Sequence, residues 1–147
     1  MRCFHFDSEI VLPHTRATVF SFFADARNLE LLTPPWLRFS ILTAGPIEMR
    51  EGTRIEYRLR LHGLPFRWES EITAWKPPNY FVDEQRLGPY RQWIHEHIFE
   101  EHAGGTRVLD RVKYAVFGGR LINWLLVAPD LRRIFDYRRR ELSRLFR

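Results

Sequence analysis

The sequence predicts an α+β protein in which one antiparallel sheet packs against a long C-terminal helix. Three observations indicate this fold class. Several segments alternate apolar with polar residues and are separated by glycine and proline turns, which is typical of antiparallel strands. Short helical spacing appears only after the first predicted strand, within residues 15–32. Apolar residues then recur at helical spacing from residue 131 to residue 145, which predicts a long amphipathic helix.

Length and composition indicate one ordinary domain. The chain has 147 residues, 45% of them hydrophobic, which is enough for a single core. Aromatic residues reach 15%, and large rings commonly line cavities that hold apolar ligands. Cys3 is the only cysteine, no signal segment is apparent, and no apolar run is long enough to span a bilayer. We therefore expect one domain over residues 1–147, without a transmembrane segment, in the cytoplasm.

The net charge of +5 raises nucleic acid or an anionic membrane as partners. All but two of the 23 basic residues are arginine, and they are spread along the chain. No nucleic-acid recognition motif accompanies them. We therefore expect no nucleic-acid partner.

The N-terminal third predicts a strand followed by short helices. Residues 3–12 alternate as a strand does, and Pro13 ends them. Thr15 is placed to cap a short helix that runs to Phe23. Residues 25–32 give a second short helical segment, which the following prolines stop. Residues 39–42 predict a brief strand.

A long hairpin and a last strand extend the predicted sheet. Residues 53–61 and 66–75 pair around a turn at residues 62–65, with an apolar face that includes Tyr57 and Trp68 and a charged outer face. The last strand, residues 106–116, follows a turn at residues 103–105. Its inward residues are Val108, Asp110, Val112, Tyr114 and Val116.

The C-terminal part predicts two helices. Residues 121–127 form an apolar segment, expected as a short helix, and Pro129 is expected to start the final helix because proline is tolerated in a first turn. The stripe of that helix is Leu131, Ile134, Phe135, Arg138, Leu142 and Leu145.

Residues 81–99 carry the predicted site. They read as two strands joined by a turn at residues 87–90. Because side chains alternate along a strand, one face of the second strand carries Trp93, His95, His97 and Phe99. By the same period, one face of the first strand carries Phe81, Asp83 and Gln85. Polar residues among aromatic ones on a single face predict the wall of a partly polar cavity.

The turn lengths set the expected partners of the two histidines. A two-residue turn at residues 103–104 pairs His97 with Asp110, and the turn near Pro89 places Asp83 opposite His95. Each imidazole is then within reach of a carboxylate. A register slip of one residue would turn all of these side chains outward.

Three interpretations of this polar cluster remain open. It is a buried structural network, a set that orients a ligand in a mostly apolar pocket, or a chemical site. A chemical site means a metal held by His95, His97 and a carboxylate, or acid–base catalysis by a His–Asp pair. Because each histidine has an expected carboxylate partner, we expect no metal and no cofactor.

Short motifs along the whole chain carry a family resemblance. They are Pro13, Val19-Phe20, Asn28-Leu29, Leu32-Thr33-Pro34-Pro35-Trp36, Gly52, Tyr57, Trp68, Phe81-Val82-Asp83-Glu84-Gln85, Gly88-Pro89-Tyr90, Trp93-x-His95-x-His97-x-Phe99, Gly105-Thr106 and Asp110-x-Val112-x-Tyr114. With the order of elements, they resemble the START/polyketide-cyclase (SRPBCC) superfamily, and within it a bacterial ligand-binding subgroup. The resemblance implies a helix-grip fold, in which a curved antiparallel sheet wraps the last helix around a ligand cavity. It implies no particular reaction, because the superfamily includes lipid carriers, hormone receptors, aromatase/cyclases and co-chaperone domains.

The predicted function is binding of a small hydrophobic or amphipathic molecule, lipid- or polyketide-like, in the cavity. Ring walls are expected from Tyr57, Trp68, Phe81, Trp93, Phe99 and Tyr114. A polar end would be oriented by Asp83, Gln85, His95, His97 and Asp110. The apolar residues 35–37 and 121–127 are expected either to edge the cavity mouth or to pack against the end of the sheet. The alternatives are a cyclase, dehydratase or hydrolase using His95 or His97, and a protein-interaction module.

Overall fold

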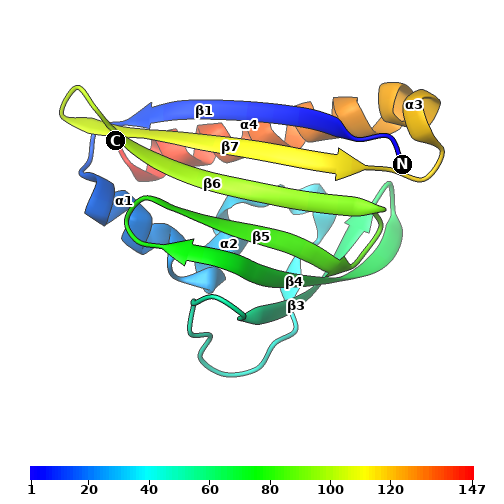
Figure 1. Ribbon diagram of the computed structural model, residues 1–147, viewed down its shortest axis with the longest axis horizontal. Helices are drawn as coiled ribbons and strands as arrows, with labels where there is room; N and C mark the ends of the chain where they lie inside the picture. Colours follow the sequence, from blue (N-terminus) through cyan, green and yellow to red (C-terminus); the bar gives the residue numbers. More distant parts are fainter.

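Seven antiparallel strands form one curved sheet in the order β1-β7-β6-β5-β4-β3-β2 in the computed structural model, which describes residues 1–147 (Figure 1). The strands are β1 (Phe4–Leu12), β2 (Ser40–Ile41), β3 (Arg54–Leu61), β4 (Leu64–Lys76), β5 (Tyr80–Leu87), β6 (Gln92–His102) and β7 (Gly105–Ala115). The helical segments are α1 (Arg16–Phe23), η1 (Ala26–Asn28), α2 (Leu29–Leu32), η2 (Pro35–Leu37), α3 (Gly119–Ile122), η3 (Asn123–Val127) and α4 (Ala128–Leu145).

Strands β2 to β7 follow one another in the sheet as they do in the chain, and β1 returns to pair with β7. The long helix α4 runs behind β1 and β7 in Figure 1 and packs on the inner face of the sheet. This arrangement confirms the predicted α+β helix-grip fold. The predicted first helix is also confirmed, because Thr15 accepts a hydrogen bond from the backbone N–H of Thr18 at its start.

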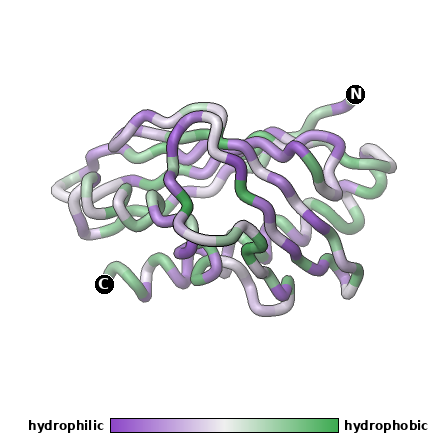
Figure 2. The backbone as a smooth tube through the Cα atoms, turned by 90° about the horizontal axis from the view of Figure 1, so that it is seen from below, coloured by the Kyte–Doolittle hydropathy of each residue, from purple (hydrophilic) through white to green (hydrophobic).

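Alternation of side chains separates the two faces of each strand. In β6 the residues Trp93, His95, His97 and Phe99 are buried, while Glu96 between them is exposed. The tube in Figure 2 accordingly changes between hydrophilic and hydrophobic along the chain. The predicted inward face of β6 is therefore confirmed.

Two-residue turns fix the register of the β6–β7 and β3–β4 hairpins. Ala103 and Gly104 both have positive φ (46° and 81°), as a type I′ turn requires, and His97 pairs with Asp110 as predicted. The turn predicted at residues 62–65 is shorter than expected. His62 and Gly63 alone form it, also with positive φ, and residues 64 and 65 belong to β4.

The C-terminal helix is longer than predicted. We expected a new helix to begin at Pro129, but helical structure continues from Gly119 through η3 into α4. The segment η3 is a π-helical turn in which the backbone N–H of Ala128 donates to the carbonyl of Asn123. A widened turn accommodates Pro129, which lacks an N–H and clashes with the carbonyl of the preceding turn in a regular α-helix.

The apolar segment 121–127 does not edge the cavity and contacts the sheet only in part, through Val127 and through Asn123, which accepts a hydrogen bond from Tyr114. Leu121, Trp124, Leu125 and Leu126 are 46–72% exposed and neither edge the cavity nor pack on the sheet. Only Val127 packs against the core. Helical structure begins at Gly119, but its apolar stripe reaches the core only from Val127 onward, which leaves the preceding side chains exposed.

The core consists of two apolar clusters that α4 joins. Leu142 and the following Phe146 belong to one cluster, and Leu131 and Phe135 belong to the other. The helical stripe is therefore buried as predicted at four of its six positions, whereas Ile134 is partly buried and Leu145 is 37% exposed. None of the helices is both long and apolar enough to cross a membrane.

Candidate functional site

A cavity of about 190 Å³ lies between the inner face of strands β3–β6 and the helical layer of α1, α2 and α4. Of its 27 lining residues, 19 are hydrophobic. The sheet side is contributed by alternate residues of each strand, which is why one face supplies the whole wall. Such a cavity suits an apolar molecule.

Aromatic rings form a continuous part of this wall. Tyr57 and Trp68 stack across β3 and β4 with ring centroids 5.9 Å apart, and Trp93 meets Trp68 edge to face at 5.5 Å. Phe81 stacks on His97 at 4.1 Å. Offset and edge-to-face rings hold one another in fixed orientations, so these walls are preorganised.

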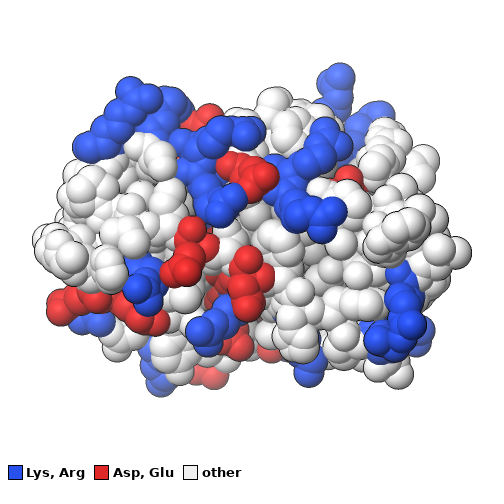
Figure 3. All heavy atoms as spheres, turned by 90° about the horizontal axis from the view of Figure 1, so that it is seen from above, with Lys and Arg blue, Asp and Glu red and all other residues white.

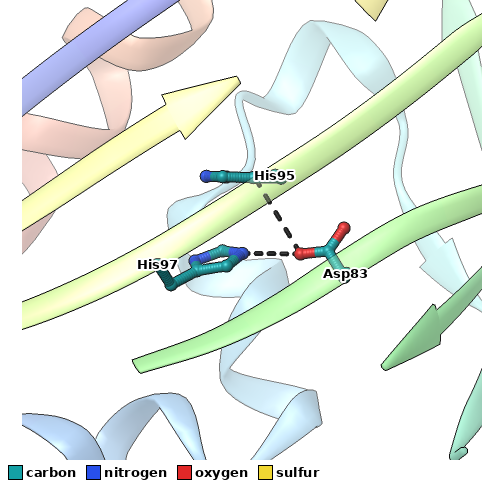
Figure 4. A group of neighbouring side chains, drawn as sticks. All are labelled: Asp83, His95 and His97. Carbon is teal, nitrogen blue, oxygen red and sulfur yellow. Dashed lines mark hydrogen bonds and ion pairs between the residues drawn. The ribbon is translucent and has the colours of Figure 1, made fainter. Parts of the chain in front are cut away.

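A polar cluster interrupts the apolar wall. His95 and His97 stack with ring centroids 3.7 Å apart on β6, and Asp83 faces them from β5 (Figure 4). The Nε2 atom of His97 lies 2.5 Å from Asp83, and Nε2 of His95 lies 2.8 Å from Asp110. Arg138 of α4 bonds the Asp110 carboxylate through Nε at 3.1 Å and Nη2 at 3.2 Å. Both histidines therefore have a carboxylate partner as predicted, although each bonds the carboxylate expected for the other.

The hydrogen-bond directions follow from what each group can donate. A carboxylate only accepts, so His97 and His95 each donate through Nε2. Arg138 only donates, so Nδ1 of His97 accepts from it at 3.4 Å. On the other side, Ser70 donates to Asp83 at 3.4 Å, which leaves the Tyr57 hydroxyl to donate to Ser70 at 3.3 Å. The cluster is thus one chain of directed hydrogen bonds.

Burial and charge set the protonation of this cluster. Burial is the main cause that lowers the pKa of His97 from 6.5 to about 4, so its imidazole is neutral near pH 7. Burial acts to raise the pKa of Asp110, but the Arg138 guanidinium together with the hydrogen bond from His95 and the neighbouring charges holds that pKa below its usual range. Burial also acts to raise the pKa of Asp83, but the hydrogen bond from His97 and the neighbouring charges lower it overall. Both carboxylates are therefore ionised.

Asp83, His95 and His97 are also the residues that could hold a metal, since one donor atom of each lies within 4.8 Å of the others. Two features of the cluster oppose this use. The Asp83 and His97 donor atoms already bond each other, and the Arg138 guanidinium adds a fixed positive charge beside His97. The expectation of no metal stays a prediction.

The structure brings seven of the predicted site residues to the cavity wall: Tyr57, Trp68, Phe81, Asp83, Trp93, His95 and His97. Four lie elsewhere. Gln85 bonds the backbone N–H and carbonyl of Tyr90 and so closes its own turn. Phe99 packs between rings of α1, Asp110 lies behind His95, and Tyr114 donates its hydroxyl to Asn123.

Several wall residues were not predicted from the sequence. Arg138 is the most important, and the signal for it was a lone arginine within an apolar helical stripe. Ser70 had a similar signal as a single polar residue on the apolar face of β4. The contributions of α1 and α2, such as Phe23 and Leu32, depend on how the helices pack, which a strand pattern does not encode.

The curved sheet, the C-terminal helix and the cavity between them together define a helix-grip protein. The model of the family described as polyketide cyclase / dehydrase and lipid transport matches residues 12–135, and the chain belongs to this family. The resemblance to the SRPBCC superfamily is thereby confirmed. A search among curated proteins finds no significant match.

Solved structures share the fold across nearly the whole chain. Protein CV1439 from Chromobacterium violaceum has a TM-score of 0.76 at 12% identity, covering 97% of this chain and 96% of that one. Ara h 8.0201 has a TM-score of 0.72 at 14% identity, covering 99% and 98%. Major latex-like protein 151 from Panax ginseng has a TM-score of 0.71 at 9% identity, covering 98% and 97%. Identities this low show the fold alone.

Proposed function

We propose that the protein binds a small, largely apolar molecule in the cavity between the sheet and α4, and that the polar cluster orients its polar end. The observation that carries this proposal is an interior cavity lined mainly by apolar side chains and interrupted by one set of buried polar groups. Family membership supports hydrophobic ligand binding in general. We propose the cytoplasm as the compartment, which the single free cysteine fits.

The size of the cavity favours a compact ligand. Its volume of about 190 Å³ is near that of an engineered protein cavity of about 150 Å³ that binds benzene. Ligand pockets for larger molecules are commonly about 300–1,000 Å³. A molecule with one or two rings therefore fits better than a long acyl chain.

Filling the cavity tests the proposal. Leu61 lines it, whereas Leu64, across the turn of the same hairpin, is 62% exposed and does not. Calorimetric titration with propylbenzene should show binding to the wild type and to Leu64→Trp, and at least tenfold weaker binding to Leu61→Trp. Equal affinity in the two variants, or none in the wild type, would contradict a binding cavity.

Acid–base catalysis is a second candidate, because His95 is oriented by Asp110 through Nε2 while its ring lines the cavity. The test is turnover of a molecule recovered from the cavity by native mass spectrometry. Product formation that His95→Gln abolishes without loss of binding would support catalysis. Recovery of the molecule unchanged would leave binding as the function. An interaction module is less supported, since its interior would be filled.

A further inference from the structure

Most donors of the polar cluster are bonded within the cluster itself. Both Nε2 groups of the histidines donate to carboxylates, and Arg138 donates to Asp110 and His97. Ser70 donates to Asp83. Nη1 of Arg138 donates to no protein group, whereas the open position beside Asp83 is an acceptor.

The main open position is Nδ1 of His95. The residue is only 6% exposed to solvent and lines the cavity, yet this nitrogen has no hydrogen-bond partner in the protein. Oδ2 of Asp83 lies 3.9 Å from it (Figure 4). Two acceptors thus face each other with no proton between them when His95 is neutral. This pair therefore offers two acceptors to a single donor group of a ligand.

The net charge of the cluster points to the same kind of ligand group. Two carboxylates and one guanidinium leave one net negative charge when both imidazoles are neutral. Arg138 neutralises Asp110, whereas Asp83 has only neutral donors, Ser70 and His97. A proton bound at Nδ1 of His95 would also neutralise this negative charge. The site therefore suits a cation or a proton and opposes a second anion.

From these observations we infer that the ligand's polar group is a protonated amine, which donates to Asp83 and to Nδ1 of His95, and that the cavity discriminates against carboxylates. This inference rests on the proposed function and specifies its ligand class: a compact aromatic or cyclic amine. Two acceptors 3.9 Å apart can both lie about 2.9 Å from one nitrogen, a normal hydrogen-bond distance.

A matched ligand series tests the inference on the wild-type protein. Phenethylamine, propylbenzene and 3-phenylpropanoate share a ring and a chain of similar length and differ in the charge of the end group. Calorimetric titration at pH 7 should give the lowest Kd for the amine, about tenfold or more below that of propylbenzene, and the highest for the carboxylate. The series needs no variant, so the outcome does not depend on whether a mutant folds.

A variant pair assigns the preference to the cluster. Asp83→Asn keeps the shape and removes the charge, so the amine should lose about tenfold in affinity while propylbenzene is unchanged. Asp136→Asn is the matched control, because Asp136 is half exposed, pairs with Arg139, does not line the cavity and should leave the ratio unchanged.

The possible failures can be told apart. Binding of propylbenzene with no preference for the amine overturns the inference and leaves the proposed function intact. Tighter binding of the carboxylate overturns it too. Absence of binding by all three ligands contradicts the proposed function and the inference with it. Zinc that copurifies stoichiometrically and competes with the amine would overturn the inference by showing that the cation is a metal.

Discussion

Among single residues, Arg138 links the long helix to the polar cluster. Its side chain is 7% exposed and that of Asp110 is 5% exposed, so the ion pair between them is almost fully removed from water. Each charge depends on the other, because an unpaired charge at this depth is costly. Arg138 also donates to His97 and so helps fix which nitrogen of that ring carries the proton.

Removing Arg138 should therefore destabilise the fold strongly. Arg138→Met leaves the Asp110 carboxylate buried without its partner, at a cost of about 3–5 kcal/mol in the free energy of unfolding. Adding Asp110→Asn should recover a large part of this loss. Urea denaturation measures both, with Arg139→Met, at a half-exposed position on the same helix, as a control expected to change stability by less than about 0.5 kcal/mol. A loss below about 1 kcal/mol in Arg138→Met would contradict the role assigned to this pair.

His97 makes stability depend on pH. Its pKa is about 4 in the folded protein and near 6.5 when unfolded, so the unfolded chain binds the proton at higher pH. The free energy of unfolding should therefore fall as pH decreases from about 6.5 to about 4, by about 1.4 kcal/mol for each pH unit within that window. Urea denaturation at a series of pH values should show this slope in the wild type and a smaller one in His97→Gln. An identical slope in the variant would assign the dependence to other groups.

At the scale of elements, short turns determine where the site residues meet. The type I′ turn at Ala103 and Gly104 sets the pairing of β6 with β7 and so places His97 opposite Asp110. This register could be predicted because turn length and side-chain alternation are both local. The position of Gln85 could not, because β4 and β5 contain register shifts and the turn after β5 takes up its side chain.

The same turn offers a test of register control. Ala103 holds a left-handed conformation (φ 46°) that is unfavourable for alanine and better tolerated by asparagine. Ala103→Asn should raise the free energy of unfolding by about 0.5–1 kcal/mol, whereas Ala103→Val should lower it. Thermal denaturation compares the two. Destabilisation by asparagine would show that the turn does not adopt this conformation.

For the whole molecule, α4 is the element that holds the fold together, since it contributes to both core clusters. The fold could be predicted because strand alternation and the helical stripe each extend over many residues. The length of the C-terminal helix could not, since Pro129 is compatible with either a helix start or a π-helical turn. The cavity walls from α1 and α2 depend on packing between distant segments, which leaves no periodic signal in the sequence.

Removal of α4 should abolish cooperative folding. Leu131, Phe135, Leu142 and Phe146 are all buried, and each buried large side chain contributes about 1.5–3 kcal/mol. Their combined loss is comparable to the usual total stability of about 5–15 kcal/mol. A chain ending at Ala128 should show no cooperative transition in differential scanning calorimetry. A sharp transition would mean that the sheet and short helices form a core of their own.

Nuclear Overhauser effects between bound propylbenzene and protein methyl groups test most directly whether an apolar molecule binds inside the cavity. The expected contacts are to methyl groups of the cavity wall, such as those of Ile55, Leu59 and Leu131. Leu121 and Leu125, exposed apolar side chains at the start of the C-terminal helical region, provide the contrast at 61% and 52% exposure. Elsewhere on the surface, basic and acidic side chains lie among uncharged ones, as the face in Figure 3 shows. Contacts to the wall residues alone would support a ligand-binding interior. Contacts confined to Leu121 and Leu125 would contradict it.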